Sequence, residues 1–157
     1  MSEFRTIVSE TDMFEDYVHR VIDKLSPEDV REANAYGVDP DILVLSSLET
    51  SALKCVALID DEPVMLGGFT RPQEDGLVGP WMVHTERDNS MSDMLKIVKQ
   101  ARRLVNLAAA DHALSNLVLA ANERSLWFLS SAGFRVLPQD VWVGENVFRR
   151  FYRGRTH

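Results

Sequence analysis

Cysteine is nearly absent from this sequence of 157 residues, because Cys55 is the only one. A single thiol excludes an internal disulfide and any metal site built from several thiolates. The four histidines are scattered without the short spacings that place two imidazoles on one ion, so we expect no metal site. Cys55 lies between Lys54 and Val56 in an apolar run, which favours a small core residue over a nucleophile.

Long hydrophobic runs are also missing. No apolar segment approaches the roughly 20 residues that a membrane-spanning helix needs, and the first ten residues lack the basic and then apolar layout of a signal peptide. We therefore expect a protein that is neither secreted nor bound to a membrane. The composition, with 45% hydrophobic and 26% charged residues, is typical of one globular domain over residues 1–157, ending in a basic tail over 149–157.

The net charge of −7 is distributed unevenly along the chain. Residues 1–90 contain 19 acidic and 7 basic residues, whereas residues 91–157 contain 5 acidic and 10 basic ones. Two interpretations stay open: the basic residues decorate solvated helix surfaces, or the second half of the chain meets an anion.

The spacing of hydrophobic residues predicts the element order β-α-α-α-β-β-β-α-β-α-β-β. Ser26 and Ser90 are the expected caps of two helices, and Asp61-Glu62-Pro63 is the expected turn of a hairpin. We expect Ile42 and Leu45 of the third helix to face inward. The predicted strands cover residues 4–8, 53–60, 64–70, 77–85, 114–121, 134–138 and 146–152. The predicted helices run from Thr11-Asp12 to about Leu25, from 26 to about 36, from 39 to about 50, from 90 to 108, and from 122 to 132. Leu95 is expected to belong to the apolar stripe of the helix over 90–108.

The segment NERSLWFLSSAGF, from Asn122 to Phe134, follows a predicted buried strand. Asn122 is a favourable helix cap, and Gly133 permits the left-handed turn that ends the helix before Phe134 returns to the core. Trp127 and Phe128 are expected to be large apolar anchors. Each of these residues thus has a purely structural interpretation.

This segment also resembles the signature of the GCN5-related N-acyltransferase (GNAT) superfamily, in which a strand is followed by asparagine and the helix ends in glycine and phenylalanine. The preceding three-stranded meander and long helix are arranged as in that superfamily. The resemblance implies an α+β fold with a central, mixed, twisted sheet of about six to seven strands flanked by helices. It further implies that the strand before Asn122 splays from its neighbour, leaving a V-shaped gap for the pantetheine arm of acetyl-CoA.

Other segments are similar to the small internal virion proteins of short-tailed phages (podoviruses), which have a GNAT-like fold. These segments are REANAYGVDP, EPVMLGG and WMVHTERD, and with the segment above the similarity covers roughly residues 28 to 138. The resemblance implies a protein packaged in the phage particle or needed for its assembly. It implies virion or host proteins as partners, and the virion or the host cytoplasm as the location.

The position of the cofactor's pyrophosphate in that superfamily is a glycine-rich turn before the long helix. Here residues 84–93, HTERDNSMSD, contain no glycine. Glu86, Asp88 and Asp93 would oppose an incoming pyrophosphate, whereas Arg87 and the helix dipole would favour it. If acetyl-CoA or CoA binds, the resemblance implies contacts with Val83, Arg87 and Asn122, but the acidic segment favours a degenerate site.

The groups that would handle protons are also altered. The superfamily often places a tyrosine near the thiolate leaving group, and by spacing its counterpart here is Leu129, which has no proton to donate. His84 and Glu86 are the two candidates for a general base, since either would lie at the end of a strand facing a substrate amine. The alternatives are a half-exposed strand residue for His84 and a solvated loop charge for Glu86.

The end of the chain combines arginines with aromatic residues. Such a combination suits phosphate contact and base stacking in nucleic acid, and it also suits a protein interface. A third interpretation is an ordinary edge strand followed by a tail. The arginines concerned are Arg149, Arg150, Arg153 and Arg155.

The sequence therefore leaves three functions open. The first is a phage virion-associated or assembly protein that uses a GNAT-like fold with a degenerate acyl-CoA site. The second is an active N-acyltransferase that transfers an acetyl group from acetyl-CoA to an amine. The third is a nucleic-acid or protein binding module that uses the C-terminal arginines.

Overall fold

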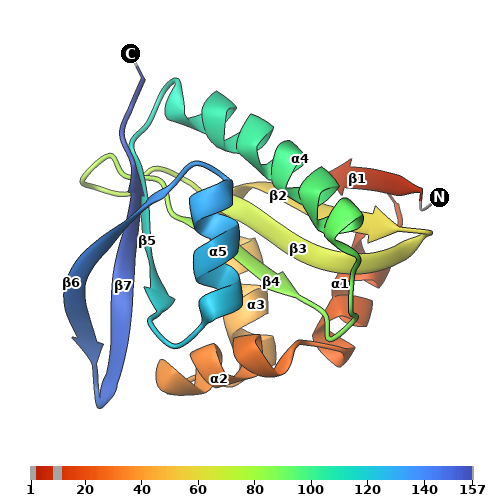
Figure 1. The fold of residues 1–157 in the computed structure, drawn as a ribbon, viewed down its shortest axis with the longest axis horizontal. Helices are drawn as coiled ribbons and strands as arrows, with labels where there is room; N and C mark the ends of the chain where they lie inside the picture. Colours follow the sequence, from red (N-terminus) through yellow and green to blue (C-terminus); the bar gives the residue numbers. More distant parts are fainter. Residues whose placement is uncertain (1–2, 9–11, 157) are drawn as a thin grey trace.

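The computed structural model of the chain describes residues 3–8 and 12–156, and it has the element order expected from the sequence (Figure 1). The expected start of the first helix at Thr11-Asp12 lies partly outside these residues. The elements are β1 (Phe4–Val8), α1 (Phe14–Asp23), α2 (Pro27–Ala35), α3 (Pro40–Thr50), β2 (Ser51–Ile59), β3 (Glu62–Thr70), β4 (Pro80–His84), α4 (Met91–Ala109), β5 (Leu114–Leu119), α5 (Glu123–Ser131), β6 (Arg135–Val143) and β7 (Asn146–Arg153).

The strands form two sheets instead of the one mixed sheet that we expected. One sheet has the order β1-β2-β3-β4 and the other the order β5-β7-β6, and every ladder within them is antiparallel. A single parallel bridge, between Val78 and Leu114, joins the two sheets. In Figure 1, α4 and α5 lie on one side of the junction and α2 and α3 on the other.

Local signals in the sequence account for most of the helix ends. The side chain of Ser26 accepts a hydrogen bond from the N–H of Asp29, and that of Ser90 accepts one from the N–H of Asp93. Asn122 caps α5 in the same way. Gly133, with a φ of 104°, adopts the left-handed conformation that ends α5 before the chain enters β6.

Two expectations about local structure are wrong. The hairpin between β2 and β3 turns at Asp60 and Asp61, whose φ angles are 50° and 64°, so Pro63 lies inside β3. Aspartate tolerates this left-handed conformation better than most residues do. In α3, Ile42 and Leu45 are about half exposed. The helix buries Val44 instead, because its hydrophobic residues are spread around the whole circumference and do not define one face.

The inward-facing residues of α4 and α5 were also predicted wrongly at one position in each helix. Leu95 and Trp127, which we expected to face inward, are 54% and 41% exposed. Their helical neighbours Met94 and Phe128 are buried in their place. A hydrophobic residue beside the true inward stripe cannot be distinguished from a member of the stripe by spacing alone.

The buried residues form two clusters, one on each side of the four-stranded sheet. The larger packs α4 and α5 against both sheets, and the smaller packs α1 and α3 against β2 and β3. No helix within residues 3–8 and 12–156 is long and apolar enough to cross a membrane.

The strand β7 lies between β5 and β6 and is therefore the central strand of its sheet. The expectation of an edge strand at the end of the chain is thus wrong. The structured strand extends to Arg153, and Thr156 then donates its N–H and its hydroxyl to the carbonyl of Ala109 in α4. The C-terminal residues are part of the packed domain.

We expect the interior of β7 to contribute strongly to stability. Phe148 is fully buried, and its ring centroid lies 4.4 Å from that of Tyr36 in the loop after α2. Phe148→Ala should therefore lower the free energy of unfolding by about 3–5 kcal/mol in urea denaturation. Trp142→Ala, in the neighbouring strand, is the control. Trp142 is 64% exposed, so its loss should change stability by less than about 0.5 kcal/mol, and equal losses for both variants would contradict this packing.

Candidate functional site

The strands β4 and β5 diverge beyond the bridge that joins the two sheets. The N–H of Val78 donates to the carbonyl of Ala113 at 3.1 Å, and the N–H of Ser115 donates to the carbonyl of Val78 at 3.0 Å. Two residues later, the carbonyl of Pro80 faces the side chain of Asn116, whose Nδ2 donates to it at 3.0 Å. An amide side chain has replaced the backbone ladder, so the strands are already too far apart to pair.

Farther from the bridge, side chains of α2 bind backbone N–H groups of β4 and β5 that face the gap. Asp29 Oδ2 accepts a hydrogen bond of 2.7 Å from the N–H of His84 at the end of β4. Glu32 Oε1 accepts one of 2.8 Å from the N–H of Leu119 at the end of β5. One helix therefore holds the ends of both diverging strands, through one carboxylate for each strand.

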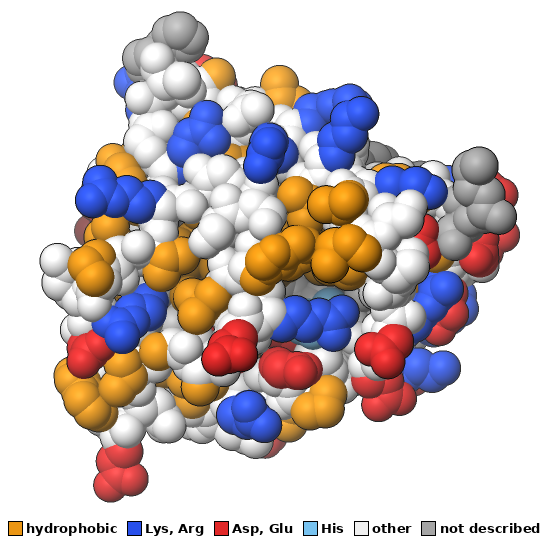
Figure 2. Space-filling model, viewed as in Figure 1, with side chains coloured by type: hydrophobic (Ala, Val, Ile, Leu, Met, Phe, Trp, Pro, Cys, Tyr) orange, Lys and Arg blue, Asp and Glu red, His pale blue; other side chains and the backbone are white. Residues whose placement is uncertain are grey.

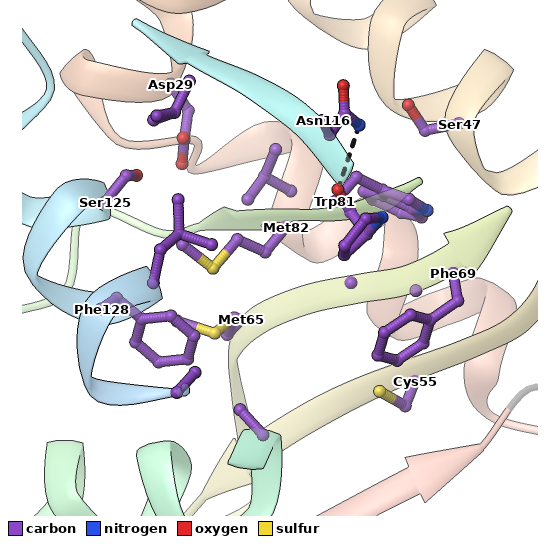
Figure 3. A pocket seen from close by; sticks show the side chains of 18 of the residues that line it. Asp29, Ser47, Cys55, Met65, Phe69, Trp81, Met82, Asn116, Ser125 and Phe128 are labelled. Carbon is purple, nitrogen blue, oxygen red and sulfur yellow. Dashed lines mark hydrogen bonds between the residues drawn. The ribbon is translucent and has the colours of Figure 1, made fainter. Parts of the chain in front are cut away.

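The gap opens into a cavity of about 440 Å³. Its lining comes from both sheets, from α4 and α5, and from α2 and α3 on the other side. In Figure 3, Asp29 and Ser125 lie at one end of the cavity, Phe69 and Cys55 at the other, and the thioether of Met82 between them. The walls are mostly hydrophobic, which is typical of a site that buries a small molecule.

On the outer surface, Figure 2 shows hydrophobic side chains gathered between α4 and α5. The large exposed hydrophobic residues of these two helices are Met91, Leu95, Leu107 and Trp127. None of these four residues lines the cavity, so this surface is distinct from the cavity wall.

The last residue of β4 and the two residues after it have their amides bound by the protein itself. The N–H of His84 donates to Asp29, that of Thr85 to the carbonyl of Val64, and that of Glu86 to the carbonyl of Lys24. The carbonyl of His84 in turn accepts the N–H of Ser26. The amides of these three residues, 84–86, are therefore unavailable to a phosphate group.

The charges near the start of α4 also disfavour an anion. Arg87, the basic residue of the segment, donates to the carbonyl of Ile59 at 3.1 Å and lies 3.5 Å from the carboxylate of Glu62. Asp93, in the first turn of α4, is buried with its carboxylate 3.8 Å from Lys96. The position where a helix N-terminus attracts an anion is thus already close to a carboxylate of the protein.

His84 and Glu86, the candidate bases, occupy different environments. His84 is 3% exposed and not half-exposed as its alternative interpretation held. Its Nδ1 lies 3.0 Å from Asp29 Oδ2, and its Nε2 has no hydrogen-bond partner among the described residues and lies 3.9 Å from Glu28 Oε2. Glu86 is exposed. Neither residue lines the cavity.

The three residues expected to contact a cofactor are not brought together as one site. Val83 lines the cavity, and its side chain packs against the cluster that contains α1 and α3. Arg87 reaches back to the turn between β2 and β3. Asn122 is fully buried, and its Oδ1 accepts the N–H of Ser125. Its side chain also contacts Glu32 and lowers the pKa of that carboxyl, against the larger opposing effect of burial.

The C-terminal arginines are partly bound within the protein. Arg149 contacts Asp140 and the carbonyl of Pro138, and Arg150 donates to the hydroxyl of Ser115 at 3.0 Å. Because side chains alternate along a strand, Arg149 and Arg153 lie on one face of β7 and Arg150 on the other. They do not form one continuous basic surface.

Sequence reasoning missed Asp29, Glu32 and Asn116, which hold the gap. Acidic residues in the first turns of a helix are ordinary features that stabilise the helix dipole, so the spacing of Asp29 and Glu32 carried no signal of a second role. Asn116 was the one available signal. A carboxamide inside a predicted buried strand needs a hydrogen-bond partner and can therefore mark a break in strand pairing.

No family model matches this sequence, and no curated protein matches it either. Solved structures do match the fold. An N-acetyltransferase from Staphylococcus aureus Mu50 aligns with a TM-score of 0.62 and 12% identity, covering 100% of this chain and 99% of that one. A GNAT-family acetyltransferase from Bacillus anthracis aligns with a TM-score of 0.63 and 13% identity, covering 97% and 94%.

A third match is an acetyltransferase from Bacillus subtilis that was solved in complex with CoA. It aligns with a TM-score of 0.60 and 11% identity, covering 97% of this chain and 99% of that one. At such identities the comparison establishes the fold alone. The chain has the GNAT acyltransferase fold, as the resemblance implied.

The thiol that lines the cavity should react slowly. Burial raises the pKa of Cys55 to about 11. A higher pKa lowers the thiolate fraction at pH 8, so alkylation by iodoacetamide should be about a hundredfold slower than for a thiol with the ordinary value of 9. The rate should rise about tenfold per pH unit up to pH 10, and unfolding in guanidinium should abolish the protection. Equal rates for folded and unfolded protein at pH 8 would contradict this environment.

Proposed function

We propose that this chain is a single GNAT-fold domain that acts as an internal virion or assembly protein of a short-tailed phage, with a degenerate acyl-CoA site. The observation that supports this proposal most directly is the segment after β4. The amides of His84, Thr85 and Glu86 donate to acceptors within the protein. A cofactor diphosphate placed on these three amides would therefore have to displace hydrogen bonds that tie this segment to β3, α2 and the loop between α1 and α2.

Electrostatics support the same conclusion. Arg87 is engaged by Ile59 and Glu62, whereas Asp93 lies in the first turn of α4. Binding a diphosphate here would require the release of the arginine and would place the anion near a buried carboxylate. Both steps cost free energy that a glycine-rich turn does not require.

The proposed role in a particle depends on the sequence resemblance over roughly residues 28 to 138. The well-packed core is compatible with such a role, because a fold can be kept for its shape after its chemistry is lost. The partners proposed for it are virion or host proteins, and the proposed location is the virion or the host cytoplasm.

A thermal-shift experiment tests the degenerate cofactor site. Ligand at a hundred times its dissociation constant adds about 2.7 kcal/mol of stability, which for a chain of this length raises the melting temperature by roughly 5–10 °C. We expect no shift with acetyl-CoA at millimolar concentration. The Bacillus subtilis acetyltransferase solved with CoA is the positive control. A shift of several degrees for this chain would overturn the degenerate site.

The proposed role in the particle has a separate test. Particles of the phage whose genome encodes this chain should contain it after purification through a density gradient, as detected by mass spectrometry. An amber mutation in its gene should reduce the yield of infectious particles. If the chain is absent from the particle and the mutant yield is unchanged, this role is wrong.

An active N-acyltransferase is the second candidate, and the contact between His84 and Asp29 favours it. If the Nδ1–H donates to Asp29, the lone pair of Nε2 is free to accept a proton. In that reaction a substrate amine would attack the thioester carbonyl of acetyl-CoA, the C–N bond would form, the C–S bond would break and CoA would leave as its thiolate. Because His84 does not line the cavity, it could take up the amine proton only through a group that lies between it and the amine. The thermal-shift experiment distinguishes this candidate, since it requires acetyl-CoA to bind.

A further inference from the structure

The outer face of α3 is apolar and acidic. Ile42 and Leu45 are 52% and 48% exposed, and Asp41 and Glu49 are exposed beside them. Residues 42, 45 and 49 are three and four positions apart, so their side chains lie on one side of the helix. Val44 is buried on the inner side, and α3 contains no lysine or arginine. Asp41, Ile42, Leu45 and Glu49 thus form an apolar surface with negative charge only, the α3 face.

The outer face of α4 has the same apolar character and the opposite charge. Met91 and Leu95 are 63% and 54% exposed, and the exposed Lys99 and Arg103 continue the same series at intervals of four residues. The four side chains therefore lie along one side of the helix. Asp93, the acidic residue of α4, is buried. In Figure 2, basic side chains lie beside hydrophobic ones along this helix. These four outward residues form the α4 face.

The groups on both faces are available to another molecule. Within residues 3–8 and 12–156, the side chains of Asp41, Glu49, Lys99 and Arg103 make no ion pair and no hydrogen bond. Each face also leaves two large hydrophobic side chains about half exposed or more. Neighbouring exposed apolar residues bordered by charge are typical of an interaction surface.

The two faces point in opposite directions. The helix α4 packs on one side of the four-stranded sheet and α3 packs on the other, so their outer faces lie on opposite sides of the domain (Figure 1). A contact between the α3 face of one molecule and the α4 face of another uses different surfaces on the two copies. Such a heterologous contact leaves one face free at each end, and further copies can therefore add until a ring closes or a filament forms.

We propose that copies of this chain associate head to tail, with the α3 face of one molecule packed against the α4 face of the next. The hydrophobic residues of the two faces then cover each other and leave water. Opposite charges favour this pairing, whereas two α3 faces or two α4 faces would bring like charges together.

The charge of the whole chain favours the same orientation. Residues 1–90, with 19 acidic and 7 basic residues, carry −12, and residues 91–157, with 5 acidic and 10 basic residues, carry +5. The half that contains α3 therefore attracts the half that contains α4 in another copy. This inference goes beyond the proposed function and does not depend on it, because self-association requires neither CoA nor a role in a particle.

Sedimentation velocity of the full chain over a concentration series tests the association. We expect the average sedimentation coefficient to rise with concentration up to about a millimolar, as for an association in the micromolar range or weaker. Salt at about 0.5 M should weaken the association, because it screens attraction between exposed charges.

Charge reversal on one face at a time tests the pairing. Asp41→Lys with Glu49→Lys makes the α3 face basic, and Lys99→Glu with Arg103→Glu makes the α4 face acidic. Each double variant should associate at least about tenfold more weakly than the wild type, because like charges then meet. An equimolar mixture of the two variants should associate again, since the basic α3 face of one fits the acidic α4 face of the other. The chain with all four substitutions should also associate.

Matched controls separate the two faces from the rest of the surface. Glu74→Lys with Glu145→Lys reverses two exposed acids in turns that belong to neither face, and it should associate as the wild type does. Leu45→Ser should weaken association by about threefold or more, because it removes apolar contact. Trp142→Ser, at an exposed residue of β6, should leave association unchanged. All the substituted side chains are exposed, and thermal melting checks that each variant is folded.

Four results would overturn the proposal. The first is a monomer at every concentration, which would leave each face to a different partner. The second is a mixture of the two charge-reversed variants that associates no better than either alone. The third is an equal loss of association in the Glu74→Lys, Glu145→Lys control, since net charge alone would then decide. The fourth is an assembly that stops at two copies, because faces on opposite sides of the domain cannot close a dimer. None of these results bears on the CoA experiment, so the two proposals fail separately.

Discussion

The divergence of β4 from β5 is the constraint on which the rest of the structure depends. Two strands that pair only at Val78 and Leu114 leave backbone groups facing each other across a gap. A buried backbone group without a partner costs about 1–3 kcal/mol. The chain supplies side-chain partners instead, from Asn116 near the bridge and from Asp29 and Glu32 farther along. The gap is thus stable without a ligand because α2 spans its open end.

The use of carboxylates to bind the strand N–H groups also affects what the site can bind. Carboxylates are good acceptors for strand N–H groups, but they bring negative charge into the cavity, and Asp29 also draws His84 and Ser26 together. This contact uses the amide of His84, the last residue of β4, and the neighbouring amides of Thr85 and Glu86 are bound in turn. The contacts of α2 therefore hold the ends of both diverging strands, and the contact of Asp29 also occupies the amide of His84.

The sequence predicted the order of the elements because the signals for it are local. Ser26, Ser90, Asn122 and Gly133 act at helix ends through contacts within a few residues. The inward faces of α3 and α5 were harder to predict, since hydrophobic residues such as Trp127 surround the true stripe. The role of Glu32 as acceptor for a strand N–H could not be predicted from the sequence. Its partner Leu119 is 87 residues away, and nothing in either local sequence indicates the contact.

Magnitudes show why carboxylates near a helix N-terminus disfavour an anionic ligand. Two unit charges 4 Å apart interact by about 4 kcal/mol at an effective dielectric constant of about 20, whereas a helix N-terminus typically stabilises an anion by about 0.3–1 kcal/mol. A phosphate brought close to Asp93 or Asp29 would thus lose more from repulsion than it gains from the dipole of α4. The fold therefore retains a cavity between its two sheets, while the carboxylates of Asp29 and Asp93 disfavour a phosphate brought close to either of them.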